Sequence, residues 1–166
     1  MQPLVFSLFI YTFIINIVMA ENYKPKTAIN GSGLVIPRMV SLNKSLVFMR
    51  SGPGYKYPVL FEFKKKKYPV KVIAEFNIWR KVSTFNNITG WVHTKLLSSF
   101  RTGIILKTTI LRKNPSNQST HIATLLPKLV VEINKCNIKW CRVIITQKKV
   151  YKGWIKKNVV WGSIIN

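Results

Sequence analysis

One pattern of residues occurs twice in this sequence. The first copy comprises Met49-Arg50, Trp79-Arg80-Lys81-Val82 and Gly90-Trp91-Val92, and the second comprises Leu111-Arg112, Trp140-Cys141-Arg142-Val143 and Gly153-Trp154-Ile155. The arginine precedes the tryptophan block by 29 positions in the first copy and by 28 in the second. The repeat divides the chain into two tandem units of roughly 55 to 60 residues each. Units this small bury about 60% of their unfolded surface, which disfavours an enzyme with a deep cleft.

Within each unit the apolar residues recur at every second position. One face of the first unit would carry Val70, Val72, Ala74 and Phe76, with Lys71, Ile73 and Glu75 on the other, and the second unit would place Leu129, Val131 and Ile133 on one face. This period is typical of β-strands with one buried side, and turn-forming Gly, Pro and Asn residues separate short segments throughout. No long helical stripe interrupts the pattern after residue 20. We therefore expect an all-β chain with about five short strands per unit, curled into a small barrel.

The first twenty residues have the pattern of a signal peptide. Leu4 to Val18 is an apolar run, and Val18-Met19-Ala20 suits a signal peptidase, so residues 1–20 are expected to be removed on export. The start lacks lysine and arginine, and an uncleaved membrane anchor is the alternative, for which the run is short. Residues 21–38, rich in Lys, Pro, Asn, Gly and Ser, are expected to form a flexible linker. The domains would then span 39–98 and 99–166.

The first unit resembles the bacterial SH3-like (SH3b) domain family. The resemblance rests on Val47-Phe48-Met49-Arg50-Ser51-Gly52-Pro53-Gly54, Tyr57-Pro58-Val59-Leu60, Pro69-Val70-Lys71-Val72-Ile73, Trp79-Arg80-Lys81-Val82 and Gly90-Trp91-Val92-His93. The second unit keeps the motif residues Arg112, Trp140, Gly153 and Trp154, but has Lys113-Asn114-Pro115 in place of the Ser-Gly-Pro-Gly loop. The resemblance implies two tandem SH3-like barrels, the second diverged, and makes the first the better candidate for binding.

The loop motif has a physical interpretation. Gly52 and Gly54 on either side of Pro53 would allow positive φ next to a fixed φ, so the chain can reverse there. Arg50 is expected to be structural and to donate hydrogen bonds to loop carbonyls. Gly90 would permit a close backbone approach where the last strand closes the barrel.

The tryptophans are harder to assign. Trp91 and Trp154 are interpreted as lids on the core, with a role as ligand platforms as the alternative. Trp79 and Trp140 lie three residues before inward-facing valines, so alternation places them on the outer face unless a bulge intervenes. Resemblance to SH3-like domains makes Trp79 with Tyr55 and Tyr57 the candidate binding surface. A Trp79 that the preceding loop covers is an equal alternative.

The chain carries 27 Lys and Arg against 4 Glu, a formal net charge of +23. Such a field attracts polyanions, and the run of Lys64, Lys65, Lys66 and Lys67 is its sharpest local patch. The 20 Ile and 13 Asn offer a second explanation, because an AT-rich genome enriches Lys, Ile and Asn together. Acidic wall polymers and anionic membrane surfaces are the candidate partners. Nucleic acid is disfavoured, because most of the cations are lysines, which lack the bidentate fork of arginine.

Cys136 and Cys141 are the only cysteines. In an exported chain, two cysteines at the stems of a tight hairpin are expected to form a disulfide. A metal site is disfavoured, because His93 and His121 lie in different units and zinc would need two more ligands near the cysteines.

Catalytic chemistry lacks its usual groups. There is no Asp, and the four Glu stand singly along the chain, so neither paired carboxylates nor a nucleophile with its base is evident. We expect a non-enzyme without a cofactor. The first hypothesis is an exported, periplasmic or envelope module that binds peptidoglycan or another anionic wall component through Tyr55, Tyr57, Trp79 and the lysine run, with Trp91 a further candidate. The second is a scaffold that binds peptides of other exported proteins.

Overall fold

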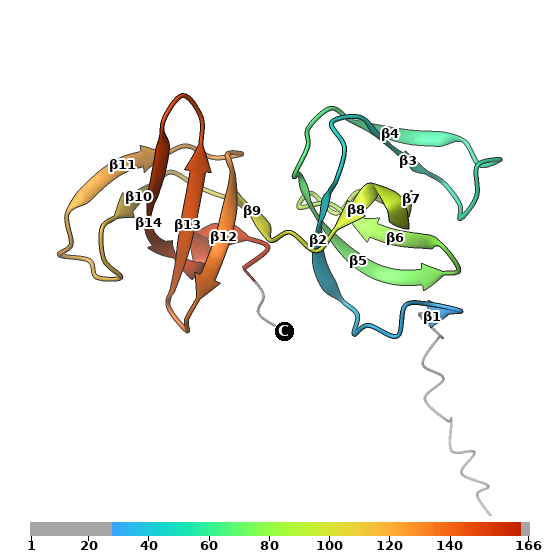
Figure 1. Ribbon diagram of the computed structural model, residues 1–166, viewed down its shortest axis with the longest axis horizontal. Helices are drawn as coiled ribbons and strands as arrows, with labels where there is room; N and C mark the ends of the chain where they lie inside the picture. Colours follow the sequence, from blue (N-terminus) through green and yellow to red (C-terminus); the bar gives the residue numbers. More distant parts are fainter. Residues whose placement is uncertain (1–27, 164–166) are drawn as a thin grey trace, which may run out of the picture.

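The computed structural model describes residues 28–163, so the expected signal peptide and the first part of the expected linker lie outside the described residues. Figure 1 shows two small β-structures side by side, joined by a short connection between β8 and β9. Two 3-10 helices, Thr94–Leu96 and Lys157–Val159, are the only helical segments in the described range. No helix within residues 28–163 has the length and apolar character to cross a membrane.

The first unit is an eight-stranded sheet and the second a seven-stranded sheet. The strands of the first are β1 (Ala28–Ile29), β2 (Arg38–Leu42), β3 (Val47–Arg50), β4 (Val59–Phe63), β5 (Pro69–Phe76), β6 (Trp79–Ser83), β7 (Thr89–His93) and β8 (Leu97–Ser98). Those of the second are β9 (Thr102–Ile105), β10 (Thr109–Arg112), β11 (His121–Leu125), β12 (Val130–Cys136), β13 (Trp140–Thr146), β14 (Val150–Lys156) and β15 (Val160–Trp161).

The two sheets have the same topology. The first runs β4-β3-β7-β6-β5-β2-β8 and the second runs β11-β10-β14-β13-β12-β9-β15, so each of these seven strands has a counterpart at the same place in the other sheet. The additional strand β1, which pairs with β5 off this path, has no counterpart. The prediction of an all-β chain of two tandem barrels is therefore confirmed, and the repeated sequence pattern corresponds to a repeated architecture.

Each barrel has its own apolar core. The first consists of Leu42, Val47, Met49, Phe63, Val70, Val72, Val82 and Val92, and the second of Ile105, Leu111, Leu125, Val131, Ile133, Cys141, Val143, Ile145, Ile155, Val159 and Val160. Most of these residues alternate along their strands, as a sheet with one buried face requires. The two cores are separate clusters, so each barrel buries its own apolar side chains.

The alternation fails in the second half of β5. A register shift between Val72 and Ala74 inserts an extra residue in β5 opposite β6. Because a bulge changes which side of the strand faces inward, Glu75 is buried, although strict alternation from Val70 and Val72 places it on the outer face. The prediction that Phe76 shares the face of Val70 is likewise wrong.

Residues 28–38, expected to belong to a flexible linker, are part of the first unit. β1 pairs in parallel with β5, with Ala28 opposite Glu75. Ser32 donates hydrogen bonds from its backbone N–H (2.6 Å) and its hydroxyl (2.9 Å) to the Glu75 carboxylate. The segment is held because β5 supplies both a free edge and a buried acceptor, which composition alone does not reveal.

Candidate functional site

Three aromatic rings meet on the first barrel. Tyr55, in the loop between β3 and β4, contacts Trp79 edge to face at a centroid distance of 5.1 Å, and Trp79 contacts His93 at 5.4 Å. Tyr55 also stacks on His93 at 5.9 Å. Trp79 and His93 are cross-strand partners at the start of β6 and the end of β7. We call Tyr55, Trp79 and His93 the aromatic cluster.

The aromatic cluster is exposed on one side only. Tyr55 is 70% exposed, whereas Trp79 is 6% exposed. Of the two sequence interpretations, the covered tryptophan is the one that the structure has, and Tyr55, a ring that contacts it, comes from the loop between β3 and β4. His93 is a member that was not expected from the sequence, although its place two residues after the Gly90-Trp91 pair could have indicated it.

The loop that carries Tyr55 is fixed by an arginine. Arg50 Nη1 donates to the carbonyl oxygens of Tyr55 (3.1 Å) and Tyr57 (2.8 Å), as the expected structural role requires. The expected positive φ at Gly52 and Gly54 is wrong, because neither glycine is among those with positive φ. Instead the Tyr57 ring lies against them, and a Cβ on Gly52 would come within 2.5 Å of its Cδ1. Gly52 is required for close approach.

Gly90 and Trp91 follow the sequence expectation in part. A Cβ on Gly90 would lie 2.5 Å from Met49 Cγ and 2.9 Å from the Arg50 carbonyl oxygen, so a close approach of β7 to β3 requires glycine. Trp91 pairs with Arg50 across these strands and is half-buried. It is not among the buried core residues, and no ring contact joins it to the aromatic cluster in the described structure.

The lysine run lies away from the aromatic cluster. Tyr57 precedes β4 and Lys64 follows it, and a five-residue strand separates its ends by about 16 Å. All four lysines are exposed, and Lys64 Nζ lies 3.3 Å from Glu62 Oε1. The structure therefore does not bring the tyrosines and the lysine run together into one patch.

Lys67 faces the second barrel. Its Nζ lies 2.6 Å from Glu132 Oε1 and 4.5 Å from the centroid of the Phe100 ring, while its carbonyl accepts a hydrogen bond from Thr102 Oγ1 at 2.9 Å. These contacts join the two barrels at the short connection seen in Figure 1. Lys67 thus takes part in the contact between the barrels, and the lysine run as a ligand patch stays a prediction.

A buried ionic cluster supports the same barrel. The Glu75 side chain is 1% exposed and pairs with Arg38 (2.5 Å) and with Arg80 Nε (3.1 Å). Burial alone raises the pKa of Glu75, but the hydrogen bonds from Ser32 and Arg38 outweigh it and leave the pKa below its ordinary value. Arg80 Nη1 donates to the carbonyls of Asn77 (2.7 Å) and Trp79 (3.0 Å), so the cluster also holds the chain at Trp79.

The second barrel keeps the loop geometry without the glycines. Arg112 Nη1 donates to the Ser119 carbonyl at 2.9 Å, as Arg50 does to Tyr57. Gly153 corresponds to Gly90, and a Cβ there would lie 2.6 Å from the Arg112 carbonyl oxygen. Trp140 is buried, whereas Trp154 is half-buried beneath Lys135, whose Nζ lies 5.8 Å from its ring.

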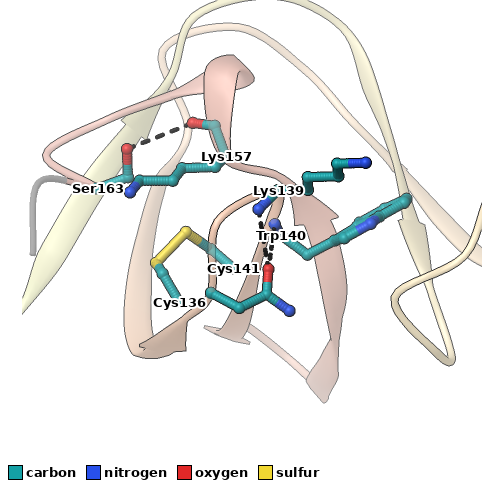
Figure 2. The surroundings of a disulfide bond; sticks show 7 residues. Cys136, Lys139, Trp140, Cys141, Lys157 and Ser163 are labelled. Atoms are coloured by element: carbon teal, nitrogen blue, oxygen red, sulfur yellow. Dashed lines mark hydrogen bonds between the residues drawn. A yellow bond between two sulfur atoms is a disulfide. The ribbon is translucent and has the colours of Figure 1, made fainter.

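Cys136 and Cys141 form the predicted disulfide across the β12–β13 hairpin (Figure 2). Asn137 closes the turn, because its Oδ1 accepts hydrogen bonds from the backbone N–H groups of Lys139 (3.0 Å) and Trp140 (2.7 Å). Within residues 28–163, no group of three or more His, Cys, Asp or Glu is placed to hold a metal ion.

Both halves of the chain match family models. Residues 45–98 match one model described as a bacterial SH3 domain, and residues 107–162 match a second with the same description. No curated protein matches the chain.

Two similar solved structures are NlpC2 and NlpC1 from Trichomonas vaginalis. The NlpC2 match has 16% identity and a TM-score of 0.34, and it covers 75% of this chain and 48% of NlpC2. The NlpC1 match has 15% identity and a TM-score of 0.34, and it covers 79% of this chain and 48% of NlpC1. An NlpC/P60 family protein from Bacillus cereus matches at 16% identity and a TM-score of 0.33, over 74% of this chain and 55% of that one. The chain thus spans about half the length of these proteins.

Proposed function

Because the chain belongs to the bacterial SH3 domain family, with one domain in each half, we propose that it is a non-catalytic, exported binding module of the bacterial cell envelope. Its ligand would be peptidoglycan or another anionic wall component. The observation that carries the proposal is the pair of family matches, since bacterial SH3 domains are typically cell-wall binding modules.

The distribution of charge supports an anionic ligand. Each glutamate within residues 28–163 forms an ion pair: Glu62 with Lys64, Glu75 with Arg38 and Arg80, and Glu132 with Lys67. The three carboxylates of the described residues are thus engaged locally, whereas the formal net charge of the chain is +23. The resulting field attracts polyanions from a distance, and its effect weakens with salt.

Contacts beyond charge would come from the aromatic cluster. The exposed ring of Tyr55 is held in place by Trp79 beneath it and by the Arg50 bonds to its loop. A rigid ring of this kind loses little entropy on binding, and it offers both an apolar face and a hydroxyl to a polymer. We propose Tyr55 as the contact residue of the first barrel, with Trp79 positioning it.

The direct test is sedimentation of the purified chain with purified sacculi. Binding to untreated sacculi and to sacculi stripped of accessory anionic polymers would identify peptidoglycan as the ligand. Binding to the untreated form alone would identify the accessory polymer. A chain that stays in the supernatant with both preparations contradicts the proposal.

A second candidate function is the binding of peptides from other exported proteins. It is favoured by β4, an edge strand whose Val59, Leu60 and Phe61 are exposed. An edge with unpaired backbone groups and apolar side chains can add a strand from a partner. Replacing Leu60 with Lys would abolish that mode and leave sedimentation with sacculi unchanged.

A further inference from the structure

The two barrels differ at one equivalent place. In the first, His93 lies opposite Trp79 in the β6–β7 register. In the second, Lys156 lies opposite Trp140 in the β13–β14 register. Residues directly opposite one another in an antiparallel pair have side chains on the same face, in contact range. The ring that covers one edge of Trp79 is therefore replaced by a flexible cation beside Trp140.

The second covering ring is absent as well. In both loops an arginine donates a hydrogen bond to the backbone carbonyl seven residues later. Arg50 donates to Tyr57 in the first barrel, and Arg112 donates to Ser119 in the second. The same count along the two loops places Asn117 where the first barrel has Tyr55. An exposed amide thus stands in place of the phenol ring that contacts Trp79.

The surface beside Trp140 is hollowed, although the indole itself is buried. A hollow of about 350 Å³ is lined by Asn117, Ile138, Lys139, Trp140, Lys156, Lys157 and Asn158. A second hollow of about 250 Å³ shares Asn117, Trp140 and Lys156 with it and extends to Thr109 and Arg112. The two hollows share these three lining residues, and we call them together the Trp140 groove. Its larger part is in the size range of ligand pockets.

The charge of the Trp140 groove is uncompensated. Neither hollow is lined by an acidic residue, and none of the ion pairs of the described structure involves Lys139 or Lys156. Figure 2 shows the Lys139 side chain and the Trp140 indole extending to the same side, away from the disulfide, whereas the Lys157 side chain runs toward Ser163. The ammonium groups available to a ligand are thus those of Lys139 and Lys156.

We propose that the Trp140 groove binds a carboxylate carried on a short peptide, and that within the proposed function this is the peptide carboxylate of peptidoglycan. Lys139 and Lys156 would bind the carboxylate through charge-assisted hydrogen bonds. Asn117 and Asn158 would donate to neighbouring carbonyls, and the exposed side chain of Ile138 would contact the aliphatic part of the peptide beside the largely buried Trp140. The identification of the peptide as part of peptidoglycan rests on the proposed function. The inference that a carboxylate is bound rests on the residues of the groove alone.

The test follows the five indole N–H resonances of the full chain by NMR during titration with soluble peptidoglycan fragments released by a muramidase. The resonance of Trp140 is expected to shift, and fragments with amidated carboxylates are expected to shift it far less. A Trp140 resonance that does not move, or that moves equally with both fragment preparations, would overturn the proposal.

Two matched variants separate site-specific charge from net charge. The double variant K139Q/K156Q is expected to bind the fragments about tenfold more weakly, because both charge-assisted hydrogen bonds are lost. The control K148Q/K149Q removes the same charge from the β13–β14 turn and is expected to bind as the parent does. Equal weakening in the two variants would reduce the effect to net charge and contradict the groove. Restoring the first barrel's residues, N117Y/K156H, is expected to close the groove and abolish the Trp140 shift.

A separate probe distinguishes failure of the groove from failure of the wall hypothesis. An acetylated tripeptide of Glu-Ala-Ala carries free carboxylates and no sugar. If the tripeptide shifts the Trp140 indole resonance while the chain fails to sediment with sacculi, the groove proposal is supported and the proposed wall function is contradicted. If the chain sediments with sacculi while neither the tripeptide nor the fragments shift the Trp140 indole resonance, the wall function is supported and the groove proposal is contradicted. A shift with a phosphate polymer but with neither carboxylate probe also overturns it.

Discussion

The phenol ring of Tyr55 meets the indole of Trp79 edge to face, with the ring centroids 5.1 Å apart, and so covers Trp79. From the sequence alone, Trp79 could be either exposed or covered. The Y55A variant should expose Trp79 and cost about 1 kcal/mol of unfolding free energy, the usual range for one aromatic pair. Tryptophan fluorescence should shift to longer wavelength. The control Y151A removes an exposed tyrosine from the second barrel and should leave the emission unchanged. Identical spectra for Y55A and the parent would show that Tyr55 does not cover Trp79.

Glu75 should make the stability of the first barrel depend on pH. Since the pKa of Glu75 is lowered by folding, its carboxylate stabilises the fold above the unfolded pKa of about 4.3, and that stabilisation is lost as the pH falls through the folded value. Denaturant unfolding should therefore show E75Q destabilised at pH 7, by about 3 kcal/mol because Arg38 and Arg80 lose their buried partner. The gap should narrow at pH 3. The control E62Q, at an exposed pair with Lys64, should change stability little at either pH. A gap for E75Q that is independent of pH would contradict this role.

The disulfide should stabilise the second barrel locally. Cys136 and Cys141 close a loop with a sequence separation of 5 residues, for which the loop-entropy model gives about 2 kcal/mol. The C136S/C141S variant should show faster amide exchange in β12 and β13, and unchanged exchange in the first barrel, whose core is separate. A reductant should reproduce this in the parent and have no effect on the variant. Equal acceleration in both barrels would mean that the two barrels unfold as one unit.

The loop glycines should differ in their tolerance of a side chain. In G52A the new methyl group would meet the Tyr57 ring at 2.5 Å, so the ring must move, and we expect a loss of about 1 to 3 kcal/mol. In the matched control G54A the nearest ring atom lies at 3.3 Å, and the loss should be small. Thermal unfolding of the two variants measures the difference. A greater loss of stability in G54A than in G52A would contradict this explanation and would indicate that backbone conformation requires the glycines.

The local sequence patterns predicted the fold class, but not the number of strands, which is eight and seven where about five per unit were expected. The repeat at Arg50 and Arg112 and the alternation along the strands predicted two all-β units, and the spacing of Cys136 and Cys141 predicted the disulfide. These features depend on neighbouring residues or on one hairpin. Glu75 shows the limit of this approach, because its burial depends on a bulge in β5.

The candidate site was predicted less well, because its contacts are distant in sequence. Ser32 and Arg38 reach Glu75 across 43 and 37 positions, and Lys67 reaches Glu132 across 65. Composition placed the first two in a linker and the third in a ligand patch. The family resemblance grouped Tyr55 and Tyr57 with Trp79, and of the two tyrosines Tyr55 contacts the Trp79 ring. The resemblance did not indicate that His93 completes the cluster.

The central claim is that the chain recognises a wall component through charge and through the aromatic cluster together. The measurement is the fraction of chain sedimented with sacculi at about 0.1 M and about 1 M salt, where the Debye length falls from roughly 10 to 3 Å. We predict strong binding at low salt, a persistent fraction at high salt, and loss of that fraction in Y55A. Binding that high salt abolishes entirely and that Y55A leaves intact would reduce recognition to electrostatics. Absence of sedimentation at both salt concentrations would contradict the claim outright.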